Sequence, residues 1–536
     1  MARRDILIVA LCLALVADAV CAKTAAPVAT PLQIALHNAR QETAIAGILE
    51  EMASAAVHGQ IVLRNVRVVD AVAATASPSE TVVVWNSTIY WIGENGAEPK
   101  LEHPVVIDGR GRYLAPGLVD MHVHSDSASD WLLDLANGVT AVREMDGFPW
   151  LLRMRDAVSA RRVLAPSMYV AGTIINAAPI EGYAVLARNA LDGRRFVRQQ
   201  AACGYDFIKV HNNLPRPIFD AVADEASRLG MDLVGHVPHD IPVRYAVAHG
   251  MRTLEHLKGF LDDRTLTIGE TDYAAVVDGP DVWNTPTLYT GIGHARGKDT
   301  DALLERPQNR YVPERRREKW RRLAATPADD SARAGLAAAG YMRTITARLA
   351  AEHARFLAGT DAAGYPFMVM GFALIDELHE LERAGLSPVE VLRSATIEPA
   401  RAMRVADEFG AIRKGLRADL VLLDDDPLKS TKAFDDRRGV MAHGYWLDEA
   451  VLDRALEALA NVYARSDASI AVDHDAVERT YEGMRARIET GFAFDAMAVG
   501  ELMSALRAAG FGDAADRFDA LAGMPTTAPC AEYLPK

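Results

Sequence analysis

Short apolar runs and segments of helical periodicity alternate through the middle of the chain. The apolar runs lie at 207–211, 232–236 and 253–257. Apolar residues in 215–230 recur at the spacing of one helical face, and 243–250 is a shorter helical segment that ends at glycine. Strands that alternate with helices at this spacing predict βα units and a parallel sheet.

Alternating β-rich runs flank this region on both sides. They lie at 61–72 and 81–93 before it, and at 419–424 and 438–447 after it. We therefore predict an α/β fold with a (β/α)8 TIM-type barrel inserted in a small β-sandwich. The predicted parts are the first part of the sandwich at 60–116, the barrel at 117–399 and the second part of the sandwich at 400–447.

Helical segments are predicted at both ends of the chain. An amphipathic helix at 32–57 forms most of a predicted N-terminal helical segment, 23–59. Helical periodicity returns at 451–464, 476–489 and 496–509, within a predicted C-terminal helical extension at 448–536. This extension could cap the barrel or form a subunit contact, so a homo-oligomer is one of the assemblies it allows.

The first 22 residues have the pattern of a secretory signal peptide. Arg3 and Arg4 form a basic start, and the apolar run 6–17 is shorter than a typical membrane span. Small residues precede a cleavage position after Ala22, and the stretch 23–30 is rich in Ala, Pro and Thr. We therefore predict a signal peptide at 1–22, a periplasmic or secreted location, and no stable membrane insertion of the mature chain.

Composition and charge narrow the class of protein. The chain has 536 residues, of which 50% are hydrophobic and 24% are charged, as in an ordinary soluble globular protein. Its length allows a large core and more than one domain. The formal net charge of −14 makes nucleic acid an unfavourable partner.

His122 and His124 form the first candidate site. They end a short apolar run and are spaced two residues apart. Side chains at this spacing on a strand point to the same face, and neutral imidazole is the commonest protein metal ligand. The pair predicts half of a metal site, whereas two ordinary hydrogen-bonded histidines are the alternative if no other ligand lies nearby.

Four further candidate ligands lie at the ends of later apolar runs, the end at which (β/α)8 barrels place their chemistry. An ammonium is costly to bury. Lys209 is therefore either carboxylated by CO2 to a carbamate that bridges two metals, or it reaches the surface or forms a local salt bridge. His236 and His256 each end an apolar run. Asp361 enters a glycine-containing loop, where it could bind metal and accept a proton, or cap the next helix.

Eight stretches of the chain, taken together, resemble the amidohydrolase superfamily of metal-dependent hydrolases. Within the superfamily the resemblance is strongest to the imidazolonepropionase-like and prolidase-like dipeptidase branch. The stretches occur in the family's order and are LAPGLVDMHVH (114–124), GVTAVREM (138–145), DFIKVHNNLP (206–215), LVGHVP (233–238), TLEHLKG (253–259), AGTDAAG (358–364), LRSATIEPARAM (392–403) and KGLRADLVLLDDDPL (414–428).

The resemblance implies a site with two divalent metals per chain, most simply Zn²⁺. The implied ligands are His122, His124 and Asp361 for the more buried metal, His236 and His256 for the second, and carboxylated Lys209 as the bridge. The implied nucleophile is a hydroxide between the metals. Asp361 would be the general base that passes the proton to the leaving amine.

The function that this resemblance implies is an exported amidohydrolase that cleaves amide-type C–N bonds in dipeptides, N-acyl amino acids or similar small amides. Two alternatives stay open: a mononuclear hydrolase of cyclic amides or amidines of the imidazolonepropionase type, and a catalytically silent binding protein on the same scaffold. The candidate substrate-binding residues are His211, Tyr289 and Arg143. The basic run at 305–322 is either a solvated helix face or a rim that attracts anionic substrates.

Overall fold

The computed structural model describes residues 30–180, 184–262, 267–268, 273–277, 281–465 and 472–522. The predicted signal peptide at 1–22 lies outside these residues, as do the start of the predicted N-terminal segment and the end of the predicted C-terminal extension. Within the described residues, no helix combines the length and the apolar character needed to cross a bilayer.

The two β-rich flanks of the chain form one mixed sheet of eight strands. Its order is β19-β18-β17-β5-β1-β2-β3, with β4 paired to β1, and β5 from the first flank pairs antiparallel with β17 from the second. Apolar residues of both flanks, including Leu63, Leu420 and Trp446, share one core. The strands are β1 Gln60–Asp70, β2 Thr75–Trp85, β3 Thr88–Glu94, β4 Val105–Asp108, β5 Tyr113–Pro116, β17 Leu420–Leu423, β18 Arg437–Ala442 and β19 Tyr445–Asp448.

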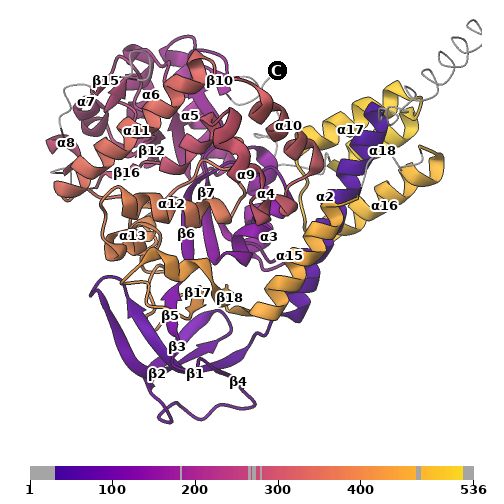
Figure 1. Cartoon of the computed structure of the whole chain (residues 1–536). Coiled ribbons are helices and arrows are strands. Elements are labelled where there is room, and N and C mark those ends of the chain that lie inside the picture. The colour runs from indigo at the N-terminus through magenta and orange to yellow at the C-terminus, as the bar shows by residue number, and fades with distance from the viewer. Residues whose placement is uncertain are drawn as a thin grey trace, which may run out of the picture.

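The middle of the chain forms parallel βα units around two further sheets, as the alternation of strands and helices predicts (Figure 1). One sheet has the order β6-β7-β8 and the other the order β10-β9-β11-β12-β13-β16. Isolated parallel bridges join Ala171 to Phe207, Asn284 to Phe356 and Val123 to Ala362. The strands are β6 Leu118–Val123, β7 Val139–Glu144, β8 Ser167–Val170, β9 Ile174–Asn176, β10 Ala184–Leu186, β11 Phe207–Val210, β12 Asp232–Gly235, β13 Met251–Glu255 and β16 Trp283–Thr285. The strands are thus linked in the order expected of a barrel, but they form two sheets rather than one closed barrel.

Helices cover the outside of these sheets (Figure 1). The helix predicted within 215–230 is α6 Arg216–Leu229, and it ends at Gly230 in the left-handed conformation, with φ +70°. The other helices of this region are α3 Ala128–Ala136, α4 Pro149–Ser159, α5 Ala190–Cys203, α7 Val243–Ala248, α8 Ala274–Val277, α9 Asp301–Leu304, α10 Glu314–Ala325, α11 Asp330–Ala351, α12 Phe372–Arg383, α13 Pro388–Ser394 and α14 Ile397–Ala402. A short antiparallel pair, β14 Leu261–Asp262 and β15 Thr267–Ile268, follows β13.

The first described helix and the helices after residue 448 meet in one bundle beside this body (Figure 1). The indigo helix α2 Pro31–Ala55 lies along α15 Glu449–Tyr463, α16 His474–Glu489 and α17 Ala496–Ala508, and α18 Gly512–Ala522 packs on α17. Arg40 links α2 to α16, because its guanidinium donates to the Thr480 hydroxyl at 3.0 Å and to the Ala476 carbonyl at 2.8 Å.

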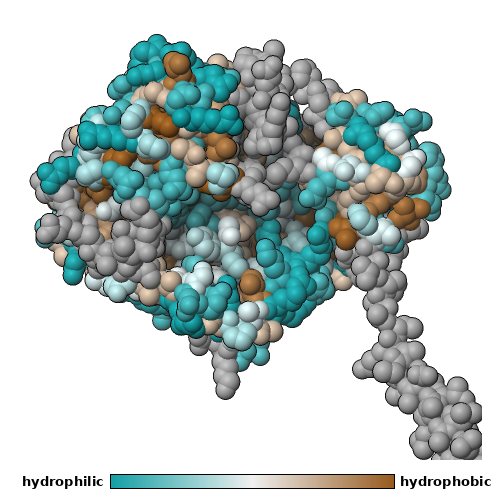
Figure 2. All heavy atoms as spheres, turned by 90° about the horizontal axis from the view of Figure 1, so that it is seen from above, coloured by the Kyte–Doolittle hydropathy of each residue, from teal (hydrophilic) through white to brown (hydrophobic). Residues whose placement is uncertain are grey.

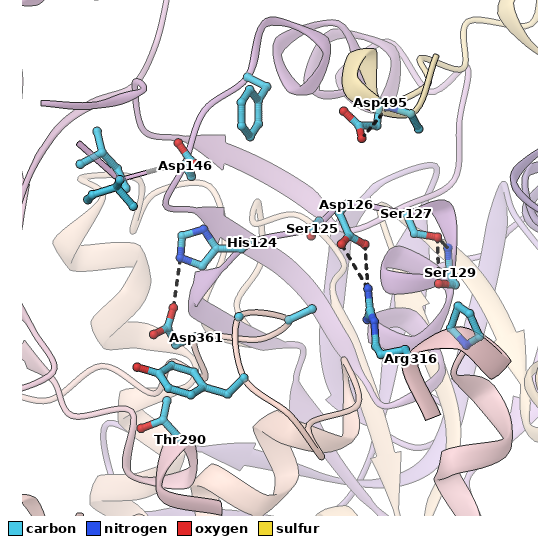
Figure 3. Close-up of a pocket in the computed structure, with 18 of the residues that line it drawn as sticks. His124, Ser125, Asp126, Ser127, Ser129, Asp146, Thr290, Arg316, Asp361 and Asp495 are labelled. Atoms are coloured by element: carbon cyan, nitrogen blue, oxygen red, sulfur yellow. Dashed lines mark hydrogen bonds and ion pairs between the residues drawn. The ribbon is translucent and has the colours of Figure 1, made fainter. Parts of the chain in front are cut away.

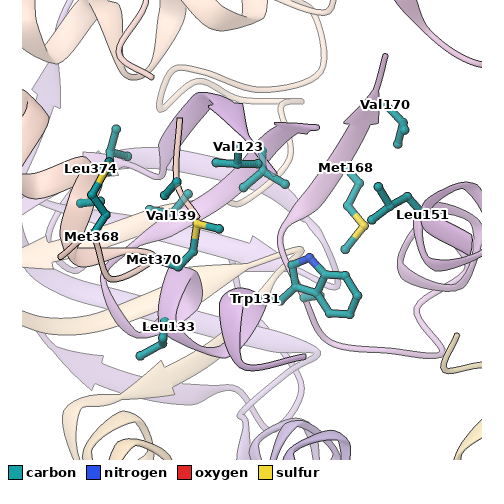
Figure 4. Close-up of a cluster of buried hydrophobic side chains, with 14 of the residues drawn as sticks. Val123, Trp131, Leu133, Val139, Leu151, Met168, Val170, Met368, Met370 and Leu374 are labelled. Carbon is teal, nitrogen blue, oxygen red and sulfur yellow. The ribbon is translucent and has the colours of Figure 1, made fainter. Parts of the chain in front are cut away.

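A large apolar core lies between the first parallel sheet and its helices. In Figure 4, Met168 of β8 lies between Trp131 on α3 and Leu151 on α4, and Val139 of β7 lies beside Met370. The Trp131 ring also lies 5.9 Å from the ring of Phe492, which belongs to the C-terminal part of the chain. Aromatic contact therefore connects the helical bundle to the part of the fold that carries His122 and His124.

Candidate metal centre

A cavity of about 790 Å³ lies at the C-terminal ends of the parallel strands. The face of the molecule seen from above is hollowed among mainly hydrophilic residues (Figure 2). The candidate ligands that line the cavity are His124, Lys209, His236, His256 and Asp361. His122 lies behind them and is fully buried.

The histidines and Lys209 are placed by the ends of parallel strands, whereas Asp361 lies in the segment after the isolated bridge at Phe356. His122 is in β6 and His124 follows it, and Lys209 is in β11. His236 and His256 directly follow β12 and β13. The strands run in the same direction, so their carboxyl ends bring residues that are far apart in the sequence to one edge.

The Asp361 carboxylate is the point on which the imidazoles converge, and Figure 3 shows its contact with His124. Its Oδ1 lies 3.0 Å from His124 Nε2 and 3.4 Å from His122 Nε2, and its Oδ2 lies 3.7 Å from His256 Nε2. Ligand atoms of His122, His124 and Asp361 all lie within 4.8 Å of one another. This compact His-His-Asp group has the donor set and the burial of a divalent metal site.

The remaining candidates adjoin this group. Lys209 Nζ lies 3.3 Å from His122 Nε2, and the rings of His236 and His256 have centroids 4.7 Å apart. The predicted substrate-binding residue His211 also lines the cavity, and its ring centroid lies 3.9 Å from that of His236.

Three of the histidines form hydrogen bonds through Nδ1 to side chains outside the group of ligand atoms. His122 Nδ1 contacts Glu255 Oε2 at 2.9 Å, His236 Nδ1 contacts Asn212 Oδ1 at 2.8 Å, and His256 Nδ1 contacts Thr287 Oγ1 at 2.7 Å. The carboxylate and amide oxygens only accept hydrogen bonds, and the Thr287 hydroxyl donates to the Pro286 carbonyl. Each Nδ1 therefore carries the proton, which leaves each Nε2 lone pair free for a metal.

Glu255 was not among the residues predicted from the sequence, although it directly precedes His256. It is fully buried and also accepts from Arg143 at 2.7 Å and from the Thr253 hydroxyl. Burial raises the pKa of Glu255, but the Arg143 guanidinium and the bond from His122 outweigh it and hold the pKa well below its usual range. An ionised Glu255 therefore fixes the orientation of His122.

Arg143 and Tyr289, both predicted to bind substrate, lie elsewhere. Arg143 is buried behind the cavity wall, where it donates to the Met121 carbonyl and to Glu255. The Tyr289 hydroxyl accepts from Arg306. Neither residue is among the described residues that line the cavity.

Asp120 positions Asp361. Asp120 is fully buried and accepts from the backbone amides of His122 and Thr360 and from the Thr360 hydroxyl. The next backbone amide, that of Asp361, donates to the His122 carbonyl at 2.7 Å. These bonds tie β6 to the loop after Phe356 and hold Asp361 in the left-handed region, at φ +60°.

Burial sets the protonation states that metal binding requires. Desolvation lowers the pKa of His122 to about 4 and that of His256 to about 3, so both rings are neutral near pH 7. Burial alone would raise the pKa of Asp361, but His256, His122 and His124 together hold it far below its usual range. Neutral imidazoles and an ionised carboxylate are the ligand forms of these groups.

The outer wall of the cavity comes from both ends of the chain and from α10. Ala39 of α2 and Glu501 of α17 line it, as do Arg315 and Arg316 of α10. Arg316 pairs with Asp126 at 3.1 Å (Figure 3). Part of the basic run predicted at 305–322 therefore faces the cavity rim.

Comparison with known proteins agrees with this geometry. Residues 113–440, more than half of the chain, match the amidohydrolase family. An adenine deaminase from Rubrobacter xylanophilus is 23% identical over 381 residues, which cover 68% of this chain and 54% of that protein. The chain thus spans about half the length of this relative.

Two solved structures share the fold. A bottromycin amidohydrolase has a TM-score of 0.65 and 28% identity, covering 80% of this chain and 95% of its own. A putative prolidase from Bifidobacterium longum has a TM-score of 0.60 and 22% identity, and the match covers 75% of this chain and 99% of the prolidase. These findings confirm the predicted resemblance: the chain belongs to the amidohydrolase family.

Proposed function

We propose that the chain is a metal-dependent hydrolase that cleaves amide-type C–N bonds in small molecules such as dipeptides and N-acyl amino acids. The observation that carries this proposal is the convergence of imidazole Nε2 atoms on the buried Asp361 carboxylate. Family membership supports it, and so does the fold shared with a bottromycin amidohydrolase and a putative prolidase.

The residues present fit a divalent metal, for which we propose Zn²⁺. His122, His124 and Asp361 would hold one ion, and His236 and His256 a second one bridged by carboxylated Lys209. Burial lowers the pKa of Lys209, which favours the neutral amine that can react with CO2. A bound metal would polarise the amide carbonyl and acidify water.

The chain's own residues would move the proton and select the substrate. Asp361 would accept a proton from the attacking water at a carboxylate oxygen and deliver it to the leaving nitrogen. Arg315 is exposed at the cavity rim and makes no ion pair with the described residues, so it could receive a substrate carboxylate. The cavity volume is within the usual range for small-molecule sites.

A mononuclear enzyme acting on cyclic amides or amidines is the second candidate. The observation that favours it is that, in the described residues, the compact ligand group contains only His122, His124 and Asp361. Lys209 would then act as a neighbouring amine and not as a bridge.

We also propose that the protein is exported to the periplasm or secreted, on the basis of the signal-like pattern in residues 1–22. N-terminal sequencing of the protein from cells that produce the full chain tests this. Cleavage should leave Lys23 as the first residue, whereas protein that keeps Arg3 and Arg4 would contradict the proposal.

Asp361→Asn should abolish hydrolysis while metal remains bound, because the amide oxygen can still act as a ligand but cannot accept the proton. The expected loss in kcat is at least about 100-fold, measured on a panel of dipeptides and N-acyl amino acids alongside metal content. The control Glu501→Gln, which removes an exposed cavity carboxylate, should keep activity. If the wild type turns over nothing on this panel, the silent binding protein gains support instead.

Lys209→Ala distinguishes a site with one metal from a site with two metals. With bicarbonate supplied and chelators omitted, the wild type should bind about two metals per chain and this variant about one, with most activity lost. Lys258→Ala removes another cavity lysine and should keep both metals. Normal turnover by Lys209→Ala would contradict the bridged site and support the mononuclear candidate.

Glu255→Gln should weaken metal binding about 10- to 100-fold, because the neutral amide no longer strengthens and orients His122. Competition with a chromogenic chelator measures the affinity. Glu225→Gln is the matched control, since Glu225 is also a buried carboxylate paired with arginines but lies on α6. Equal affinity in wild type and Glu255→Gln would show that Glu255 serves only the stability of the fold.

A further inference from the structure

Asp146 is a buried carboxylate on the cavity wall that has no ion pair and no side-chain hydrogen bond among the described residues; the Ile174 backbone amide is the polar group beside it. Its exposed fraction is 3%, and within the described residues neither carboxylate oxygen makes a hydrogen bond of ordinary geometry. It lines the cavity on the same side as His124 (Figure 3). Burying an unsatisfied carboxylate costs stability, so such a group calls for a function.

The backbone beside Asp146 is held rigidly. The carbonyl of Gly147 accepts from the hydroxyls of Thr173 and Tyr205, both at 3.0 Å. A Cβ at Gly147 would lie only 1.8 Å from the backbone oxygen of Ala171, so the chain can pass here only with glycine. Asp146 is thus fixed at the cavity wall and does not depend on a mobile loop for its position.

Two other cavity carboxylates have dedicated partners. Asp126 pairs with Arg316, and Glu42 accepts from the Ser127 hydroxyl at 2.6 Å. Asp146 has no ion pair of this kind in the described part of the chain. Asp146 is therefore a buried cavity carboxylate that is available to a bound cation.

The surroundings of Asp146 place that cation beside the reacting centre. The charge of Lys209 acts on Asp146, and burial, which outweighs it, raises the pKa of Asp146 to about 7. If Lys209 becomes a carbamate in the metal-loaded enzyme, it offers no positive charge that could pair with Asp146. A positively charged group of the substrate would then be the partner that compensates Asp146.

We propose that Asp146 binds the free α-ammonium group of the substrate, so that the enzyme prefers dipeptides with a free N-terminus to N-acyl amino acids. This inference rests on the proposed hydrolase function and narrows its substrate class. An ammonium next to the scissile amide is the feature that separates these two kinds of substrate. Asp146 would thereby select the substrate and position its amide.

A matched pair of compounds tests the inference: Leu-Phe and N-(4-methylpentanoyl)-Phe, which differ only in the α-amino group. The wild type should prefer Leu-Phe by about 10- to 100-fold in kcat/KM, the value of a hydrogen bond to a charged group. Asp146→Asn should remove this preference, mainly by raising KM for Leu-Phe. The kcat/KM for the deaminated compound should stay within about 2-fold of the wild-type value. Glu501→Gln, which removes an exposed carboxylate of the same cavity, should keep the preference.

Equal kcat/KM for the two compounds in the wild type would overturn the inference and leave the hydrolase proposal standing. Equal losses for both compounds in Asp146→Asn would also overturn it, because a purely structural role affects both. If neither compound is hydrolysed, the hydrolase proposal fails for this class, and calorimetric binding decides the inference by itself. Tighter binding of Leu-Phe that disappears in Asp146→Asn would support it, and equal binding would contradict it.

Discussion

The site depends on one buried carboxylate, Asp361, being kept ionised among neutral imidazoles. The imidazole rings of His122, His124 and His256 surround this carboxylate, but neutral rings carry no net charge that could balance it. Those rings would lose their ligand form if they were protonated, and their burial prevents this. A divalent cation satisfies both requirements at once, because it pairs with the carboxylate and accepts the imidazole lone pairs.

This arrangement needs exact placement, and the fold supplies it through buried polar contacts. Asp120 ties the strand of the two histidines to the Asp361 loop. Glu255 and Arg143 form a second buried pair that orients His122 from behind. Buried carboxyl groups are costly unless each has its hydrogen-bond partners, so we interpret Asp120 and Glu255 as positioning residues for the metal ligands.

Much of the site could be predicted from the sequence, because histidines spaced two apart on a strand share a face and the ends of parallel strands share an edge. The role of Arg143 as a buried partner of Glu255 could not be predicted. The sequence does not tell whether a residue inside a strand faces the cavity or a buried partner on another strand. The sequence left open whether the C-terminal extension caps the barrel or forms a subunit contact. The structure places Glu501 of this extension in the cavity wall together with Ala39 of α2, and only tertiary packing brings these two helices together.

The central claim is that His122, His124 and Asp361 hold a divalent metal. Anomalous scattering from crystals of the mature chain, grown with Zn²⁺ and bicarbonate and measured on both sides of the zinc absorption edge, tests it most directly. The account predicts a zinc peak bounded by the two Nε2 atoms and the Asp361 carboxylate. A fully loaded protein with zinc bound elsewhere and no peak at this position would contradict it.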